Sequence, residues 1–432
     1  MSILKQALVV AVTAIAVLYL PGLWKEKLPV IFDGRVEPGF ERVFEAFKEH
    51  YRNGIEPSDG GSAFAAYHKG KKVVDIWGGY ADKEAHRPWK PDILHNIYSS
   101  GKGVAAIAVA MLVDRGLLKY SDKVVKYWPE FGKHGKQDVT VETLLSHQAG
   151  IPFPNESLSW DLFRDHDRLA DVLADSVPQW EIGTGHGYHA LTMASFCGVL
   201  LRKVDPKHRT LGQFVHDELE VPFGIDIHFG LRKELFYRAT RMEEDKYTTS
   251  QMLSVIINNP LMRSYIFKSL FGGSDTLYDK MLKNTEQLLM NPYKLNDPEN
   301  RIVEVPSAFG VGTAEALAKL YSILVNGGEL NGKRIMSEKA VKQLNTVVTK
   351  GMDKVVMIDV ELGHGVIISK TPIGKAFGHS GVGGQEGFGN LELKLGYGYV
   401  TNTPTISLTE DGERYLLLRD ILYDCVRKLG EK

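Results

Sequence analysis

Hydrophobic and polar positions divide the chain into stretches of different character, and the first is a run without charge. No charged residue occurs between Gln6 and Trp24, while charged residues stand on both sides of the run. A helix of this length would rise roughly 28 Å, about the hydrocarbon thickness of a bilayer. We therefore expect residues 1–24 to be a signal anchor that makes the protein a single-pass membrane protein. A cleaved secretory signal peptide is the alternative, and a mitochondrial presequence fits less well because the segment lacks arginine.

Residues 25–38 show no clear period, and we expect them to be a linker that leads into one folded domain of residues 39–432. Apolar residues between Phe40 and Tyr51 then recur at the spacing of one helical face. Two β-prone runs that flank a glycine-containing turn predict a β-hairpin next. The two strands of this hairpin are expected at Ala63–Tyr67 and Val73–Trp77.

The most apolar helical stretch runs from Gly103 to Leu118. Because it is apolar on nearly all sides, we expect it to lie in the centre of the fold. From about residue 120 to residue 328 the pattern indicates a mainly helical subdomain, although Arg241 to Asn300 has no clean period. The clearer helical segments in this part are Val141–Leu145, Leu169–Leu173, Ala190–Arg202 and Ala314–Leu324.

Beyond Gly328 the pattern changes to short β-prone runs separated by glycine, proline and lysine, and an amphipathic helix from Tyr415 to Leu429 closes the chain. The β segments therefore lie at both ends of the domain and the helices lie between them. This order predicts an α+β fold whose sheet is built from the N- and C-terminal segments, with flanking helices and a helical subdomain. The expected late strands are Val355–Val360, Gly365–Ser369, Lys375–Ser380 and Leu391–Thr401.

Composition narrows the classes of function. The chain has 432 residues with 52 Lys and Arg against 53 Asp and Glu, so its net charge of −1 gives no reason to expect nucleic acid as a partner. Its two cysteines, Cys197 and Cys425, supply no disulfide framework. The 14 histidines include no H-E-x-x-H pattern, and the glycine clusters lack a phosphate-binding lysine. We expect neither a metal nor another cofactor.

Candidate chemistry begins with Ser99-Ser100-Gly101-Lys102, at the start of the apolar helix. Residues at i and i+3 share one helical face, so the amine of Lys102 can reach the hydroxyl of Ser99. A serine becomes a nucleophile when a base takes its proton, and a desolvated lysine can be that base. The alternative is that Ser99 only caps the helix, a role for which serine is favoured.

Two glycine-rich segments strengthen the catalytic interpretation. Residues Gly183 to His189 deliver Tyr188 just before a helix, and a buried tyrosine beside an ammonium can lower its pKa and act as a base or proton shuttle. Residues Gly378 to Gly384 follow a β-run, where a strand N–H could form half of an oxyanion hole with the N–H of Ser99. A core aromatic and a simple turn between strands are the alternatives.

These three segments, in this order, resemble the three active-site motifs of serine β-lactamases and penicillin-binding proteins. The likeness is greatest to class C β-lactamase-like esterases, a group that includes animal β-lactamase domain-containing proteins. Val141–Ile151 and Pro306–Ala314 are similar to further signature segments, and the resemblance runs from about residue 35 to the C-terminus. It implies a β-lactamase/transpeptidase-like fold with an antiparallel sheet.

The resemblance also implies residue roles. Ser99 would be the nucleophile, Lys102 its hydrogen-bonded partner and base, and Tyr188 the proton shuttle to the leaving group. His379-Ser380-Gly381 takes the place of the K-T-G strand motif, and the N–H of Val382 would be the second oxyanion donor.

Two departures from the family pattern bear on the substrate. His379 stands where a lysine holds the substrate carboxylate, and a histidine near its usual pKa is mostly neutral at pH 7. Ala190 stands where an asparagine is expected two residues after Tyr188. Both changes favour small esters or amides without an obligatory carboxylate. A true β-lactamase or peptidase, and a membrane-tethered scaffold with little turnover, are the alternatives.

Overall fold

The structure is a computed structural model that describes residues 28–242, 275–289, 291–403 and 413–431. The expected N-terminal anchor, residues 1–24, lies outside the described residues, and so does most of the stretch after Arg241 that had no clean period. Within the described ranges no helix is both long enough and apolar enough to cross a membrane.

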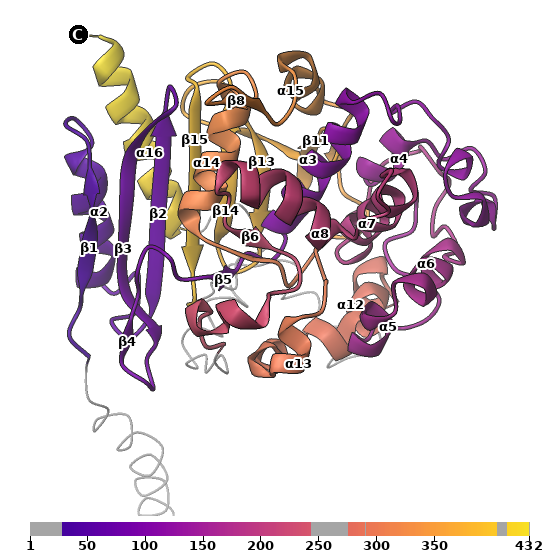
Figure 1. The fold of residues 1–432 in the computed structure, drawn as a ribbon, viewed down its shortest axis with the longest axis horizontal. Coiled ribbons are helices and arrows are strands. Elements are labelled where there is room, and N and C mark those ends of the chain that lie inside the picture. The colour runs from indigo at the N-terminus through magenta and orange to yellow at the C-terminus, as the bar shows by residue number, and fades with distance from the viewer. Residues whose placement is uncertain (1–27, 243–274, 290, 404–412, 432) are drawn as a thin grey trace, which may run out of the picture.

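A large antiparallel sheet organises the fold and confirms the predicted α+β class (Figure 1). Its strand order is β1-β3-β2-β15-β14-β13-β12-β11-β10, so strands from the two ends of the sequence meet where β2 pairs with β15. The short β4 (Arg87–Pro88) adds to β3. The strands are β1 (Phe32–Val36), β2 (Gly61–His68), β3 (Lys71–Asp82), β10 (Thr349–Met352), β11 (Asp359–Leu362), β12 (Ile367–Lys370), β13 (Lys375–Gly381), β14 (Gln385–Asn390) and β15 (Leu395–Thr401).

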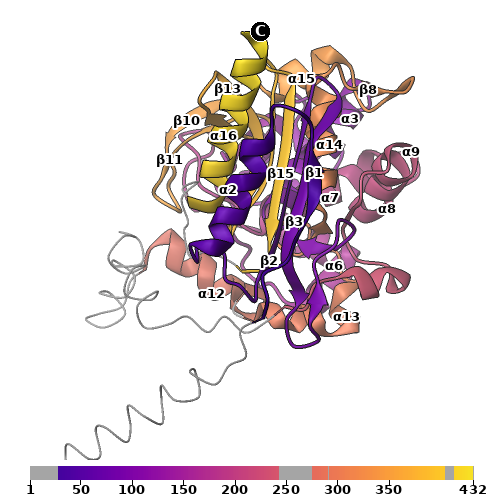
Figure 2. The same ribbon diagram turned by 90° about the vertical axis from the view of Figure 1, so that its left-hand side faces the viewer.

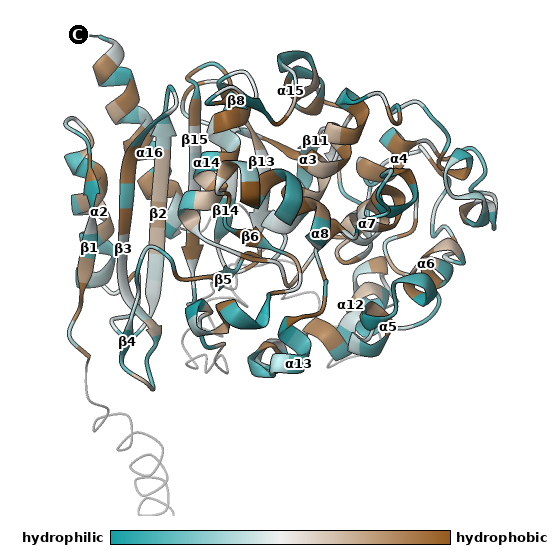
Figure 3. Ribbon diagram, viewed as in Figure 1, coloured by the Kyte–Doolittle hydropathy of each residue, from teal (hydrophilic) through white to brown (hydrophobic). Residues whose placement is uncertain are grey.

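Helices cover both faces of this sheet. On one face α2 (Glu41–Arg52) and α16 (Glu413–Gly430) lie side by side, as Figure 2 shows. On the other face α3 (Ser100–Asp114) and α14 (Ala314–Val325) pack against the strands. Thirteen residues of α3, from Ser100 to Leu112, are buried, which confirms the central place expected for this helix. Hydrophobic residues follow the sheet and α14 in Figure 3, whereas peripheral helices such as α13 (Pro298–Arg301) are hydrophilic.

Paired glycines let α14 lie directly on the sheet. In the register of β14 and β15, Gly387 faces Gly398 and Gly389 faces Gly396. A Cβ atom on Gly396 would lie 2.3 Å from the backbone nitrogen of Ser322 in α14, and one on Gly398 would lie 2.4 Å from the carbonyl oxygen of Ala314. Because glycine has no side chain, α14 can pack closely against β14 and β15 at these positions.

Between α3 and α14 the described chain is mostly helical, with one small three-stranded sheet, β5-β7-β6, beside the start of α3. Its strands are β5 (His95–Asn96), β6 (Ile227–His228) and β7 (Val311–Gly312). The longer helices of this part are α6 (His166–Ala174), α7 (Thr192–Val204) and α12 (Leu277–Leu289), and the shorter ones include α4 (Val141–Leu145), α5 (Trp160–Arg164), α8 (Leu211–Val215) and α9 (Val221–Phe223).

The structure corrects three expectations about local structure. Within the expected linker of residues 25–38, Phe32–Val36 form edge strand β1. This strand forms because its backbone pairs with β3, a long-range contact that the local sequence pattern does not indicate. The strand expected at Val355–Val360 is mostly a turn, and β11 begins only at Asp359. Strand β14 was missed, since its glycines hide the alternation that marks a strand.

Candidate active site

Ser99 stands at the N-cap position of α3, yet its side chain forms no capping hydrogen bond. Its φ and ψ angles of −67° and −12° are helical, whereas a capping serine normally has extended backbone angles. Instead, Ser99 Oγ accepts hydrogen bonds from Lys102 Nζ and from the Tyr188 hydroxyl, each at 2.8 Å. The alternative reading of Ser99 as a helix cap is therefore wrong.

The backbone just before Ser99 is held in a strained conformation. Tyr98 has a φ of +45°, in the left-handed region that side chains other than glycine, asparagine and aspartate rarely adopt. The N–H of Tyr98 donates to Asn96 Oδ1 at 3.1 Å, and the N–H of Ile97 donates to the carbonyl of Gly310 at 2.9 Å. These bonds fix the sharp entry into α3 that presents Ser99 Oγ to its two partners.

Lys102 is fully buried, and within the described chain it forms no ion pair. Its Nζ donates to Ser99 Oγ and, at 3.1 Å, to the carbonyl oxygen of Ser307. Burial without a counter-charge disfavours the ammonium form, so the pKa of Lys102 lies well below its ordinary value. The lysine is therefore poised to hold an unprotonated amine beside Ser99.

Ser307 belongs to this site, although the sequence analysis gave it no role. Its hydroxyl accepts a hydrogen bond from the N–H of Ala194 at 3.1 Å, which ties the segment around Ser307 to α7. The signal that could have found it was the segment Pro306–Ala314, whose family likeness was noted without a function for any one residue.

Tyr188 reaches Ser99 as expected, but its acid–base state differs from the expectation. Burial raises the pKa of Tyr188, and the nearby Asp353 carboxylate raises it further, while the hydrogen bond with Ser99 acts in the opposite direction. The predicted lowering of this pKa was wrong, because burial disfavours the phenolate more than the hydrogen bond with Ser99 favours it. At neutral pH Tyr188 is a phenol that can donate a proton.

The strand motif lies at the end of β13, against the start of α3. A Cβ atom on Gly381 would lie 2.5 Å from the carbonyl oxygen of Ile97 and 3.2 Å from Ser100 Oγ, so the two backbones are in close contact. Ser380 points away from this contact and donates to Glu386 Oε2 at 2.9 Å. The side chain of Val382, just beyond the strand, is 48% exposed.

His379 faces Tyr188, with 6.3 Å between the two ring centroids. Its Nδ1 donates to the carbonyl oxygen of Ser380 at 2.7 Å. Burial lowers the pKa of His379 to about 3, and the positive form of Lys102 would lower it as well. The sequence analysis expected a pKa near the usual value, and the structure makes the ring more firmly neutral than that.

Several backbone N–H groups in this region have no backbone acceptor among the described residues, and two of them are the expected oxyanion donors. They are those of Ser99 and Val382, which stand at the start of α3 and just past the end of β13. Lys102 and Tyr188 thus meet at Ser99 Oγ, and the strand motif lies beside Tyr188 and the start of α3.

A model of the β-lactamase family matches residues 40–420, which is most of the chain. The chain belongs to the β-lactamase family. Among curated proteins, it is 32% identical over 374 residues to the esterase/β-lactamase LipL of Mycobacterium tuberculosis, a match that covers 85% of this chain and 82% of the relative.

Solved structures of similar proteins point the same way. A family VIII carboxylesterase superposes with a TM-score of 0.76 at 33% identity, covering 91% of this chain and 100% of that one. A penicillin-binding protein homologue from Caulobacter crescentus gives a TM-score of 0.77 at 31% identity, with coverage of 91% and 100%. These matches confirm the β-lactamase/transpeptidase-like fold, and with the site they make this member of the β-lactamase family a serine hydrolase.

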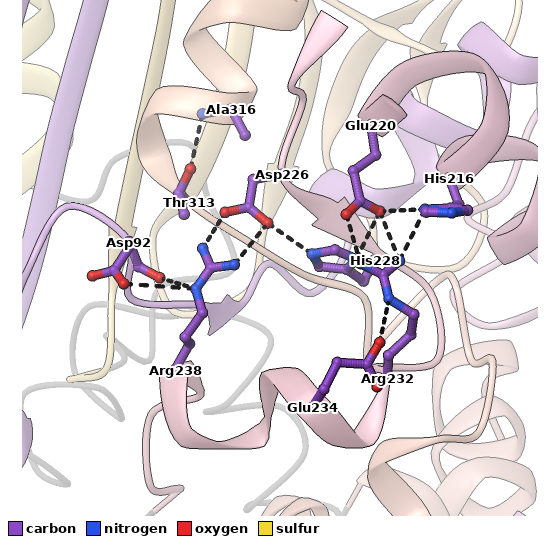
Figure 4. A network of polar contacts seen from close by, with 10 residues as sticks. All are labelled: Asp92, His216, Glu220, Asp226, His228, Arg232, Glu234, Arg238, Thr313 and Ala316. Carbon is purple, nitrogen blue, oxygen red and sulfur yellow. Dashed lines mark hydrogen bonds and ion pairs between the residues drawn. The ribbon is translucent and has the colours of Figure 1, made fainter. Parts of the chain in front are cut away.

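A polar network around the buried His228 supports the small sheet that leads into the active site (Figure 4). Strand β6 pairs with β7, and β7 pairs with β5, which ends two residues before Tyr98. His228 in β6 lies between Asp226, at 2.8 Å, and Glu220, at 3.4 Å. Arg232 binds Glu220 at 2.7 Å, and Arg238 binds Asp226, so each carboxylate also has an arginine partner.

In the part of the chain that the structure describes, no group of three or more histidine, cysteine, aspartate or glutamate side chains is arranged to hold a metal ion. The histidines nearest the site contact one another and the backbone instead. His189, for example, accepts from the N–H of Ile151 through Nε2 at 3.1 Å.

Proposed function

We propose that this protein hydrolyses small esters or amides, esters above all, through an acyl-enzyme formed on Ser99. The observation that carries the proposal is the pair of 2.8 Å hydrogen bonds from Lys102 and Tyr188 to Ser99 Oγ. The printed names of two similar proteins, an esterase/β-lactamase and a family VIII carboxylesterase, support the same class of reaction.

Lys102 is proposed as the base of the acylation step. Its lowered pKa favours the neutral amine, whose lone pair can accept the Ser99 proton as Oγ attacks the substrate carbonyl. The new C–O bond gives a tetrahedral oxyanion. The N–H groups of Ser99 and Val382, which lack backbone acceptors in the described chain, are proposed to stabilise it.

Tyr188 is proposed to complete the proton transfer. The proton that Lys102 has taken passes through the Tyr188 hydroxyl to the leaving oxygen as the bond from carbon to that oxygen breaks. Tyr188 suits this step because its raised pKa keeps it protonated until a stronger base, the leaving alkoxide, accepts the proton. Water then attacks the acyl-enzyme with the same groups acting in reverse.

The strand motif favours uncharged substrates. A carboxylate needs a positive anchor, and His379 is neutral because burial lowers its pKa to about 3. The exposed side chain of Val382 offers an apolar contact beside the proposed oxyanion site. His379, Ser380 and Gly381 are therefore proposed to position an ester along the strand edge, and β-lactams with their carboxylate are the less favoured substrates.

The uncharged run from Gln6 to Trp24 supports a further proposal, that the protein is a single-pass membrane protein anchored by its N-terminus. Alkaline carbonate extraction of cells that express the full chain should leave the protein in the membrane pellet. Release of the protein into the supernatant, together with an N-terminal sequence that begins beyond residue 24, would contradict the anchor and support a cleaved signal peptide.

Labelling with a fluorescent fluorophosphonate tests the catalytic proposal. The parent protein should be labelled and Ser99→Ala should not, and the same variant should lose hydrolysis of short and medium acyl esters. Equal labelling of the two proteins would reject Ser99 as the nucleophile. A nitrocefin assay on the same samples distinguishes substrates, since turnover that matches the ester rates would overturn the preference for uncharged esters.

A further inference from the structure

The loop that carries Tyr188 belongs to no regular helix or strand, so tertiary hydrogen bonds must set the position of its phenol. One set comes from the segment around His147. The N–H of Gly187 donates to the carbonyl of His147 at 3.0 Å, and the N–H of His189 donates to His147 Nδ1 at 3.1 Å. These bonds hold the residues on either side of Tyr188 but not Tyr188 itself.

The backbone of Tyr188 is held by Asp353, from the turn between β10 and β11. The Tyr188 N–H donates to Asp353 Oδ1 at 3.1 Å, and the same oxygen accepts from Val355 and Val356, each at 2.8 Å. The Asp353 side chain is buried. Next to it, the N–H of Lys354 donates to the carbonyl of His186 at 3.0 Å. One carboxylate oxygen thus organises its own turn and joins that turn to the tyrosine loop.

We propose that Asp353 is a positioning residue for the reaction, which acts by fixing Tyr188 at hydrogen-bond distance from Ser99. The inference rests on the proposed function, since it concerns the proton that Tyr188 delivers to the leaving group. Without Asp353 Oδ1 the partly buried N–H of Tyr188 loses its acceptor, and the loop must shift to find another. A displacement of about 1 Å in a reacting group can lower a rate about 100-fold.

A second property of Asp353 agrees with this role. Its negative charge contributes to the raised pKa of Tyr188 and so helps to keep the phenol protonated. Burial of Tyr188 is the main cause of that raised pKa, so the principal effect of Asp353 is on the position of the phenol. Asp353 itself lies outside the expected substrate contacts.

The leaving group of the substrate provides the test. Alkyl esters expel a basic alkoxide and need the proton, whereas p-nitrophenyl esters expel a stable phenolate and do not. We expect Asp353→Ala to lower kcat/KM about 10- to 100-fold for an alkyl ester and much less for the p-nitrophenyl ester of the same acid, as Tyr188→Phe should. In the Tyr188→Phe background, Asp353→Ala should cause no further loss.

Three further variants keep the test sharp. Asp353→Asn retains the accepting oxygen and should restore most of the alkyl-ester rate. In Asp353→Ser the hydroxyl can still accept from the N–H groups of its own turn, but it is too short to reach Tyr188. This variant should show the same dependence on the leaving group as Asp353→Ala, and it replaces the alanine variant if that variant does not fold. Asp205→Ala is the control, because Asp205 is an equally buried acceptor, from the N–H of Arg209, away from the site. It should leave the leaving-group dependence unchanged.

A loss for Asp353→Ala or Asp353→Ser that is equal for both esters, or that adds fully to the loss from Tyr188→Phe, would overturn the positioning role. Failure of the proposed function would look different. Ser99→Ala would then keep its activity, or Tyr188→Phe itself would show no dependence on the leaving group, whatever the Asp353 variants do.

Discussion

Two buried basic side chains, Lys102 in the active site and His228 in the network of Figure 4, have pKa values that are shifted in opposite directions. Among the described residues, the hydrogen-bond partners of Lys102 are neutral, the hydroxyl of Ser99 and the carbonyl of Ser307, and its pKa falls well below the ordinary value. Burial also disfavours a charge on His228, but hydrogen bonds to Asp226 and Glu220 outweigh it, and the pKa of His228 is raised.

The difference shows that the partners, rather than burial alone, decide which protonation state the fold stabilises. A buried histidine between two carboxylates contributes to structure, because its charged form is stabilised and joins the segment of Glu220 to that of Asp226. A buried amine with neutral neighbours costs stability when protonated and is therefore available as a base. Burial disfavours the charged form at both positions. Carboxylate partners overcome this effect at His228 and support the scaffold, and their absence at Lys102 supports the proposed chemistry.

The largest effect on ester hydrolysis should follow from removing the amine of Lys102, the proposed base. Lys102→Met should lower kcat/KM for esters about 10⁴-fold, because Ser99 then has no group to take its proton. Lys136→Met is the matched control. Lys136 is also buried, its pKa is lowered to about 8 mainly by burial, and within the described residues its Nζ donates to two carbonyls, those of Lys133 and Ser176. Steady-state kinetics should find ester turnover intact in Lys136→Met, and a comparable loss in both variants would contradict a special role for Lys102.

The paired histidine should matter for stability and not for the chemical step. His228→Gln should lower the free energy of unfolding by about 2–3 kcal/mol at pH 5. The folded pKa is raised, so the contribution is fully present below the unfolded value near 6.5 and is lost as the pH rises through the folded value. The deficit should therefore shrink toward pH 9.

Urea unfolding of the domain across this pH range measures that contribution. His216→Ala serves as the control, since the His216 side chain contacts the same Glu220 at 2.8 Å but is 40% exposed. A solvated pair of this kind contributes less than about 1 kcal/mol. A deficit for His228→Gln that grows with pH would show that the histidine is not charged in the folded state.

Giving Lys102 a carboxylate neighbour should make it resemble His228. His379 lies near enough to Lys102 for the two charges to interact, so His379→Glu places a carboxylate close to the lysine. The pKa of Lys102 should then rise by about one unit or more, and one unit corresponds to about 1.4 kcal/mol in favour of the ammonium form. Ester hydrolysis falls as the pH drops through that pKa, so the acid limb of the kcat/KM profile should move to higher pH. His379→Gln, which is neutral, should leave the limb in place, and an equal shift in both variants would mean that charge is not the cause.

Sequence alone predicted the elements whose signals are local. The hairpin around Gly70, the apolar helix after Ser99 and the helix from Ala314 follow from short-range periodicity, and the structure confirms them. Ser99 and Lys102 could be paired because three positions on a helix bring side chains together. Tyr188 needed the family resemblance, since no spacing rule connects a loop residue to a helix 89 positions earlier.

Ser307 and Asp353 could not be found in this way. The Ser307 contact is made by a carbonyl, a group that every residue carries, so the sequence contains no sign of it. Asp353 lies two residues before a Val-Val pair that favours a strand, and only the three N–H groups that donate to its oxygen reveal the turn. The sign that was available was the aspartate itself, a residue that often begins turns by accepting from the backbone two residues ahead.

The facing glycines of β14 and β15 have a consequence for the laboratory evolution of this protein. A Cβ atom on Gly396 or Gly398 would collide with backbone of α14, which cannot rotate aside as a side chain can. The helix would have to lift, and it continues directly from β7, the strand that pairs with β5 ahead of Ser99. Variants selected from libraries for activity on new esters should therefore keep glycine at these two positions, although glycine has no side chain that could take part in the reaction. Charged and polar residues on the surface should tolerate many substitutions.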